Sequence, residues 1–156
     1  MSLARKLVET ATAKGVKIAT AESCTGGLIA GALTDIPGSS AVLDRGFVTY
    51  SNAAKTEMLG VGNNLLQDHG AVSEQVARAM AEGALENSDA DLTVAVTGIA
   101  GPGGSEHKPE GRVCFACAQT NQETKTSTID FGPLGRDRVR KETVITALEL
   151  LRSALS

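Results

Sequence analysis

Apolar residues along the chain recur at two spacings, which predict alternating helices and strands. Spacings of three and four positions predict helices at residues 2–14, 28–33, 52–60, 73–87 and 136–155. Runs of β-prone residues predict strands at 16–20, 41–50, 92–96, 112–118 and 125–131. The residues around His69, between two of these helices, are expected to form a loop. The pattern predicts one three-layer α/β/α domain over residues 1–156, with a mostly parallel but mixed sheet.

The composition is typical of a water-soluble globular domain, with 42% hydrophobic and 21% charged residues. A net charge of −3 and an aromatic content of 3% do not favour binding to nucleic acid. No apolar stretch approaches the roughly 18 residues that span a membrane, and the first residues lack a secretion signal. Three cysteines are an odd number, which implies no disulfide framework. We therefore expect a cytoplasmic protein with neither nucleic-acid nor membrane partners.

Ser23 lies between a predicted strand and a predicted helix, in a segment that contains Gly26 and Gly27. The positive end of a helix dipole suits a nucleophile whose attack generates an oxyanion, and the glycines would let a substrate approach the backbone. Ser23 or Thr25 could instead serve only as a helix cap. Cys24 is the alternative nucleophile, because a helix N-terminus lowers the pKa of a thiol.

A serine nucleophile needs a base, and the sequence offers two kinds. A Ser–His–Asp triad is possible in principle, but the G-x-S-x-G elbow is absent. Lys55 follows the only tyrosine, Tyr50, at a predicted strand-to-helix junction, and a desolvated lysine can be neutral. Such junctions share one edge of an α/β sheet, so Ser23 and Lys55 could meet there. The alternative is a solvated lysine beside a half-buried tyrosine.

Residues 97–104 form the most glycine-rich segment and follow a short apolar strand. The segment fits neither the dinucleotide-fold nor the P-loop pattern. Glycines after a buried strand still suit a backbone cradle for phosphate, although an ordinary flexible loop is an equal alternative. Arg136, Arg138 and Arg140 start the last predicted helix, where cations oppose the helix dipole. This arrangement indicates either an anion clamp or a solvated basic face.

Three further patterns are interpreted as structural or accidental. Residues 105–108 match the S-x-x-K motif, but the glycines before it and Pro109 after it do not favour the helix that this motif opens. Cys114 and Cys117 lie in a predicted strand, where positions three apart face opposite sides. Glu106 and His107 could bind a metal, yet the chain has only two histidines. We expect neither a metal nor a cofactor.

Four segments resemble the CinA C-terminal domain family in their order along the chain, and together they are more specific than any one alone. They are Ala21–Gly27, Gly46–Asn52 with Lys55, Gly70–Ser73 and Thr97–Gly104, and the resemblance extends over about residues 3–155. The family is similar to nicotinamide-nucleotide amidohydrolases, which convert nicotinamide mononucleotide (NMN) into nicotinic acid mononucleotide and ammonia. Two departures concern the nucleotide contacts. Leu134-Gly135-Arg136 replaces Gly-Asp-Arg, with Arg138, which follows Asp137, as the alternative equivalent of that arginine; and Glu110 replaces the valine of Lys-Pro-Val-Gly.

The resemblance implies a serine nucleophile and a lysine base, which match Ser23 and Lys55, with Tyr50 nearby. It implies that the nucleotide contacts the segments around Cys24, Thr25, Gly26, Gly27, Asn52, Thr97, Gly98, Gly101, Gly103, Arg136 and Arg140. It further implies an amidase domain on its own, without the larger N-terminal partner of some members. We also expect a homo-oligomer acting on a pyridine nucleotide in salvage. Two alternatives stay open: an amidase of another small amide, and a non-catalytic nucleotide-binding or stress-associated domain.

Overall fold

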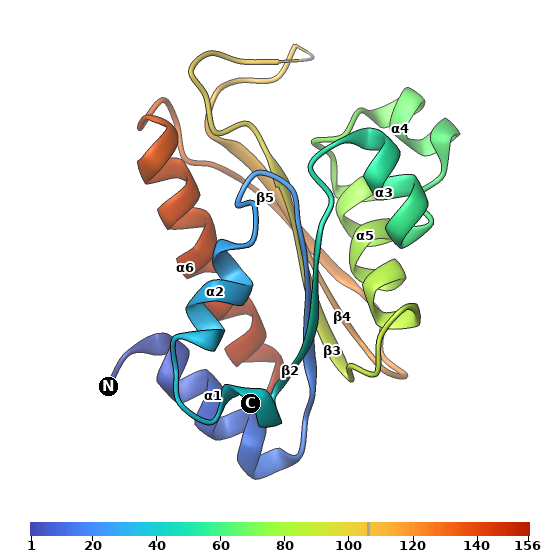
Figure 1. Ribbon diagram of the computed structural model, residues 1–156. Helices are drawn as coiled ribbons and strands as arrows, with labels where there is room; N and C mark the ends of the chain where they lie inside the picture. The colour runs from blue at the N-terminus through green and yellow to red at the C-terminus, as the bar shows by residue number, and fades with distance from the viewer. Residues whose placement is uncertain (106) are drawn as a thin grey trace.

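The computed structural model describes residues 1–105 and 107–156, which form five strands and six α-helices (Figure 1). The elements are α1 (Leu3–Lys14), β1 (Ile18–Glu22), α2 (Leu28–Thr34), the 3₁₀ turn η1 (Ser39–Ala41), β2 (Leu43–Val48), α3 (Asn52–Leu59), α4 (Asn63–His69), α5 (Glu74–Glu86), β3 (Leu92–Gly98), β4 (Arg112–Gln119), β5 (Lys125–Asp130) and α6 (Arg136–Ala154).

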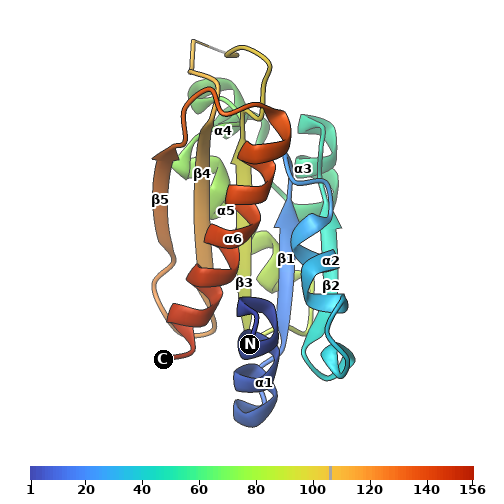
Figure 2. The same cartoon turned by 90° about the vertical axis from the view of Figure 1, so that its left-hand side faces the viewer.

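The strands form one sheet in the order β2-β1-β3-β4-β5. β2 and β3 pair with β1 in parallel, whereas β4 is antiparallel to both β3 and β5. Helices α1, α2 and α6 cover one face of the sheet, and α3, α4 and α5 cover the other (Figures 1 and 2). The expected mixed α/β fold is therefore confirmed. The carboxyl ends of β1, β2 and β3 share one edge, where α/β sheets usually bind ligands.

Side chains of different size cover the two faces of the sheet. On β3, Val94 and Val96 pack with α1 and α6, whereas Ala95 packs with α5. Because alternate residues of a strand face opposite sides, small residues gather on the α5 face and allow this helix to approach closely. The contact between α5 and α3 is tight as well, since a Cβ atom on Gly83 would lie 2.0 Å from the carbonyl oxygen of Leu59.

The structure differs from the predicted elements at two places that matter for the site. The region around His69, which we expected to be a loop, contains α4, whose buried side chain is Leu66; one buried residue gives too weak a periodicity to predict a helix. The first strand runs to Glu22, two residues beyond the predicted end, because it pairs with β2 and β3 up to that residue. Ser23 therefore follows directly on a paired strand.

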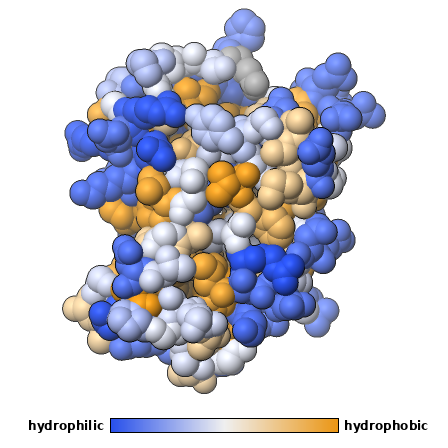
Figure 3. All heavy atoms as spheres, viewed as in Figure 1, coloured by the Kyte–Doolittle hydropathy of each residue, from blue (hydrophilic) through white to orange (hydrophobic). Residues whose placement is uncertain are grey.

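Exposed apolar side chains on the face seen in Figure 3 form separate areas between charged residues. Over the described residues as a whole, the large exposed apolar side chains are Met1, Leu28, Val48, Tyr50, Met58 and Ile145. Among the helices of the described residues, none combines the length and the apolarity that crossing a membrane requires.

Candidate active site

Ser23 is held in place by the end of β1. Its N–H donates to the carbonyl of Val96 on β3 at 3.1 Å, and its carbonyl accepts the N–H of Gly26 at 3.1 Å. Because strand side chains alternate, Glu22 points to the α2 face and Ser23 to the α3 face. Ser23 as a whole residue is 8% exposed. Ser23 thus lies at the carboxyl edge of the sheet, five residues before α2 begins at Leu28.

Lys55 reaches Ser23 from α3. The helix begins after Ser51, whose side chain accepts the N–H of Ala54, and Lys55 then lies on the buried face one turn later. Its side chain is 1% exposed, and its Nζ donates to Ser23 Oγ at 3.0 Å and to the carbonyl of Thr49 at 2.8 Å. The structure therefore brings together the serine and the lysine that the sequence analysis paired, in a buried contact.

Cys24 lies beside this pair but is poorly suited to be a nucleophile. Burial raises the pKa of its thiol to about 11, and the Glu22 carboxylate acts in the same direction. Its own backbone N–H, Arg140 and Lys55 lower the pKa by less. The thiolate is the reactive form, so the thiol is inert near neutral pH. Cys24 also lies four residues before α2 begins at Leu28, so it is not in the first turn of that helix.

The start of α2 is saturated by a buried carboxylate, that of Glu22. Its Oε1 accepts the hydroxyl of Thr25 at 2.6 Å and the N–H groups of Gly27 and Ile29 at 3.3 and 2.9 Å. Its Oε2 accepts the N–H of Ala30 at 3.1 Å. The amides in the first turn of α2 therefore already bind an anion, and donors to an oxyanion would have to come from elsewhere around Ser23. Sequence reasoning passed over Glu22, although an acidic residue shortly before a helix signals such capping.

A cavity of about 320 Å³ opens beside Ser23 and Lys55, a volume within the range of small-molecule sites. The loop that follows β3 forms one wall, and the segments before α3 and α5 form the others. The lining residues are Ser23, Cys24, Tyr50, Asn52, Lys55, Ala71, Val72, residues 97–105 and Arg136.

Arg136 joins the loop after β3 to the segment before α3. Its Nη1 donates to the carbonyl of Gly101 at 2.7 Å, and its Nη2 donates to the hydroxyl of Tyr50 at 2.9 Å. Tyr50 is 62% exposed, so its hydroxyl contacts the arginine at the mouth of the cavity. On the same loop, the N–H of Gly103 donates to Glu110 Oε1 at 2.6 Å. The glycine-rich loop is therefore held by the side chains of Arg136 and Glu110, which bind its backbone.

Several residues expected to bind substrate lie outside the cavity lining. Thr25 and Gly27 face the Glu22 carboxylate instead, and Gly26 lies against Arg140. Arg140 donates from Nε and Nη2 to the carbonyls of Cys24 and Thr25, at 3.1 and 3.3 Å. The other expected residues do line the cavity: Ser23, Cys24, Tyr50, Asn52, Lys55, Thr97, Gly98, Gly101, Gly103 and Arg136. Sequence reasoning missed wall residues such as Val72, which contribute shape rather than recognisable chemistry.

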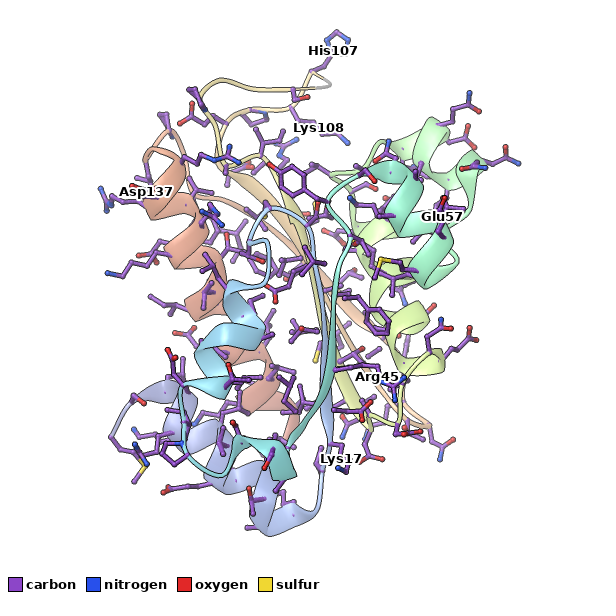
Figure 4. All side chains as sticks on the ribbon, in the orientation of Figure 1. Lys17, Arg45, Glu57, His107, Lys108 and Asp137 are labelled. Atoms are coloured by element: carbon purple, nitrogen blue, oxygen red, sulfur yellow. The ribbon has the colours of Figure 1, made fainter. Side chains whose placement is uncertain are left out.

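In the segment that matches S-x-x-K, the described residues attach the loop after β3 to the segment before α5. Ser105 and Lys108 form an isolated β-bridge, and Glu106 lies outside the described residues. Lys108 Nζ donates to the carbonyls of His69 and Val72, at 2.7 and 2.5 Å. Figure 4 shows Lys108 on the protruding loop just below His107, on the side of α4. This lysine therefore fixes the loop to the opposite wall of the cavity.

The two cysteines of the fourth strand, Cys114 and Cys117, do not form a pair that could bind a metal together. Cys114 packs against the α5 face of the sheet and Cys117 against the α6 face, and both are free thiols. Over residues 1–105 and 107–156, no three His, Cys, Asp or Glu side chains gather as metal ligands would.

Comparison with known proteins identifies relatives for almost the entire chain. The profile of the CinA C-terminal domain matches residues 1–155. A CinA-like protein of Akkermansia muciniphila is 54% identical over 141 residues, which are 90% of this chain and 34% of that protein. A CinA-like protein of Mycobacterium marinum is 53% identical over 141 residues, or 90% of this chain and 33% of that protein. The chain thus spans about a third of the length of these curated relatives.

The fold is found in solved structures as well. The crystal structure of the competence/damage inducible protein CihA from Agrobacterium tumefaciens superposes with a TM-score of 0.94 at 56% identity, covering 98% of this chain and 93% of that one. A protein from Enterobacter asburiae, described as competence or damage-inducible, gives a TM-score of 0.94 at 37% identity, covering 99% and 96%. From the profile match over residues 1–155, the chain belongs to the CinA C-terminal domain family.

Proposed function

We propose that this protein hydrolyses the carboxamide of NMN to nicotinic acid mononucleotide and ammonia. The observation that carries the proposal is the 3.0 Å contact between Lys55 Nζ and Ser23 Oγ beside a ligand-sized cavity. A serine with an adjacent base is the usual arrangement for nucleophilic acyl transfer. The choice of NMN rests on the family resemblance and on Arg136, a cation in the cavity lining that suits an anionic substrate.

The two side chains divide the chemistry between them. Burial disfavours the charged form of an amine, and a neutral Lys55 can take the hydroxyl proton while Ser23 Oγ forms a bond to the carboxamide carbon. The tetrahedral intermediate then collapses: the C–N bond breaks, and Lys55 returns the proton to the leaving ammonia. Water, deprotonated by the same amine, adds to the acyl carbon of the resulting ester; the bond from that carbon to Ser23 Oγ breaks, and Lys55 returns the proton to Oγ. The products are the nucleotide carboxylic acid and free Ser23.

The oxyanion of the intermediate needs donors other than the amides of α2, which Glu22 already occupies. We assign this role to the N–H of Cys24, the residue after the nucleophile, and to backbone N–H groups of the loop after β3. Both segments line the cavity, on either side of Ser23. Loss of one such donor typically lowers kcat by about 100- to 1,000-fold.

The decisive experiment measures ammonia release from NMN, with nicotinamide riboside and nicotinamide as matched substrates that lack the phosphate or the whole ribose phosphate. We expect release from NMN by the wild-type protein and none by the Ser23→Ala variant. Equal turnover of nicotinamide and NMN would indicate a general amidase instead. Binding of NMN in calorimetry without ammonia release would indicate the non-catalytic alternative.

A further inference from the structure

We propose that Glu22 and Arg140 act together as positioning residues that hold the Ser23 turn in its reactive geometry. This inference rests on the proposed function and extends it to two residues that touch neither the cavity nor the substrate. The turn comprises residues 23–27, between β1 and α2. Glu22 accepts hydrogen bonds from donor groups of the turn, and Arg140 donates hydrogen bonds to two of its carbonyl groups.

Glu22 and Arg140 together form what we call the clamp of the turn. The Glu22 carboxylate is buried and accepts hydrogen bonds from four donor groups. The side chain is 1% exposed. It accepts the Thr25 hydroxyl and the Gly27 N–H from the turn itself, and the N–H groups of Ile29 and Ala30 from the first turn of α2. Hydrogen bonds that a carboxylate accepts from backbone N–H groups are charge-assisted and stronger than those between neutral groups. Glu22 thus ties the turn to the helix that follows it.

The Arg140 side comes from α6, more than a hundred residues later in the chain. Nε and Nη2 donate to the carbonyls of Cys24 and Thr25, the two residues that follow the nucleophile. The planar guanidinium presents its donors in a fixed fork, which suits two adjacent acceptors. A Cβ atom on Gly26 would lie 3.5 Å from Arg140 Nη2, so the arginine packs directly against the turn.

The turn needs such support because two of its residues are glycines, whose freedom weakens the constraint from its internal bond between the Gly26 N–H and the Ser23 carbonyl. Gly26 and Gly27 both have positive φ, at 58° and 110°, and glycine has the greatest backbone freedom. Ser23 must nevertheless keep its Oγ at 3.0 Å from Lys55 Nζ. A misplacement of reacting groups by 1 Å can cost about 100-fold in rate. Contacts to both the donors and the carbonyls of a flexible turn therefore affect catalysis without touching the substrate.

The test compares kcat and KM for NMN in Glu22→Gln, Arg140→Lys and the double variant. Glutamine keeps the size of the side chain but replaces one acceptor oxygen with an NH₂ group, whereas lysine keeps the charge and loses the fork. We expect each single variant to lower kcat by about 10- to 100-fold with KM changed less than about twofold. The double variant is expected to be little worse than the more damaged single one, because both residues constrain one turn.

Two control variants remove similar contacts away from the cavity. The Glu74 carboxylate accepts two threonine hydroxyls, at 2.8 and 2.6 Å, that join α5 to β5. Arg45 donates to the carbonyl of Asn87 at 3.1 Å and lies toward the end of the sheet opposite the protruding loop (Figure 4). Glu74→Gln and Arg45→Lys should lower Tm without lowering kcat. If Glu22→Gln fails to fold, the kcat and KM of Arg140→Lys are compared with those of the control variants instead.

Two results would overturn the clamp: wild-type kcat in both single variants, or losses that multiply in the double variant. A wild-type protein that releases no ammonia would refute the proposed substrate instead. The clamp is then judged by phosphonylation of Ser23 with a fluorophosphonate, in which the O–P bond forms, fluoride leaves and the serine proton passes to Lys55. Slower labelling in both variants supports the clamp. Unchanged labelling, or no labelling of wild-type Ser23, refutes it.

Discussion

Replacing Lys55 with methionine removes the amine while keeping a long, unbranched side chain in the buried space. In the structure this amine contacts Ser23 Oγ at 3.0 Å and the Thr49 carbonyl at 2.8 Å. A positioned general base contributes about 100- to 10,000-fold to rate, or about 3–5 kcal/mol of barrier. We therefore expect kcat for NMN to fall by that factor. In this variant the Thr49 carbonyl is left unpaired, which costs about 1–3 kcal/mol of stability. Part of this cost is offset, because the Lys55 amine no longer has to be buried.

The assay is steady-state ammonia release between pH 5 and 9, with Tm recorded for each variant. In the wild type, kcat/KM should fall toward low pH, because an ammonium group cannot accept the serine proton. That decline should be absent from the residual activity of Lys55→Met. Lys55→Arg should be nearly as inactive, since a guanidinium stays protonated. If Lys55→Arg retained most of the wild-type kcat, the assignment of Lys55 as the general base would be refuted. Lys55 would then act only as a cation.

Three further predictions concern the nucleophile, the phosphate contact and the packing. Ser23→Ala should abolish ammonia release and leave NMN binding intact, whereas Cys24→Ala should retain activity; the reverse result would reassign the nucleophile. Arg136→Ala should raise KM for NMN about 10- to 100-fold and change KM for the riboside little, because a charged hydrogen bond is worth about 1.5–3 kcal/mol. In thermal unfolding, Gly83→Ala should destabilise by more than about 1 kcal/mol through overpacking. Gly31→Ala, where the added methyl meets no atom within 4 Å, should stabilise by up to about 1 kcal/mol.

The pairing of Ser23 with Lys55 could be predicted because it follows from topology. Both residues come just after strands that were recognisable from their apolar pattern, and parallel strands bring their carboxyl ends to one edge. The mixed sheet was predictable in the same way, from two consecutive strands late in the chain. These inferences need only the order of helices and strands along the chain, and the spacing of apolar residues predicts that order.

The contacts of the arginines could not be predicted, because they depend on side-chain direction on α6. Arg136 and Arg140 are four residues apart and lie one helical turn from each other. That single turn separates the cavity, where Arg136 meets Gly101 and Tyr50, from the back of the Ser23 turn, where Arg140 binds carbonyls. A pattern of basic residues indicates that cations gather at a helix start but does not assign each one a partner.

The end of β1 explains why adjacent residues have such different surroundings. Alternation along the strand turns Glu22 toward α2 and Ser23 toward Lys55, so a one-residue change of register would exchange the two faces. Because Glu22 takes the amides at the start of α2, that helix has no donors left for a substrate anion. Under the proposed function, we therefore expect negative charge to be stabilised by the Cys24 N–H and by the opposite wall of the cavity, where the glycine-rich loop and Arg136 lie. The same carboxylate that anchors the nucleophile's turn thus limits which groups around Ser23 are left to bind the anionic groups of a substrate.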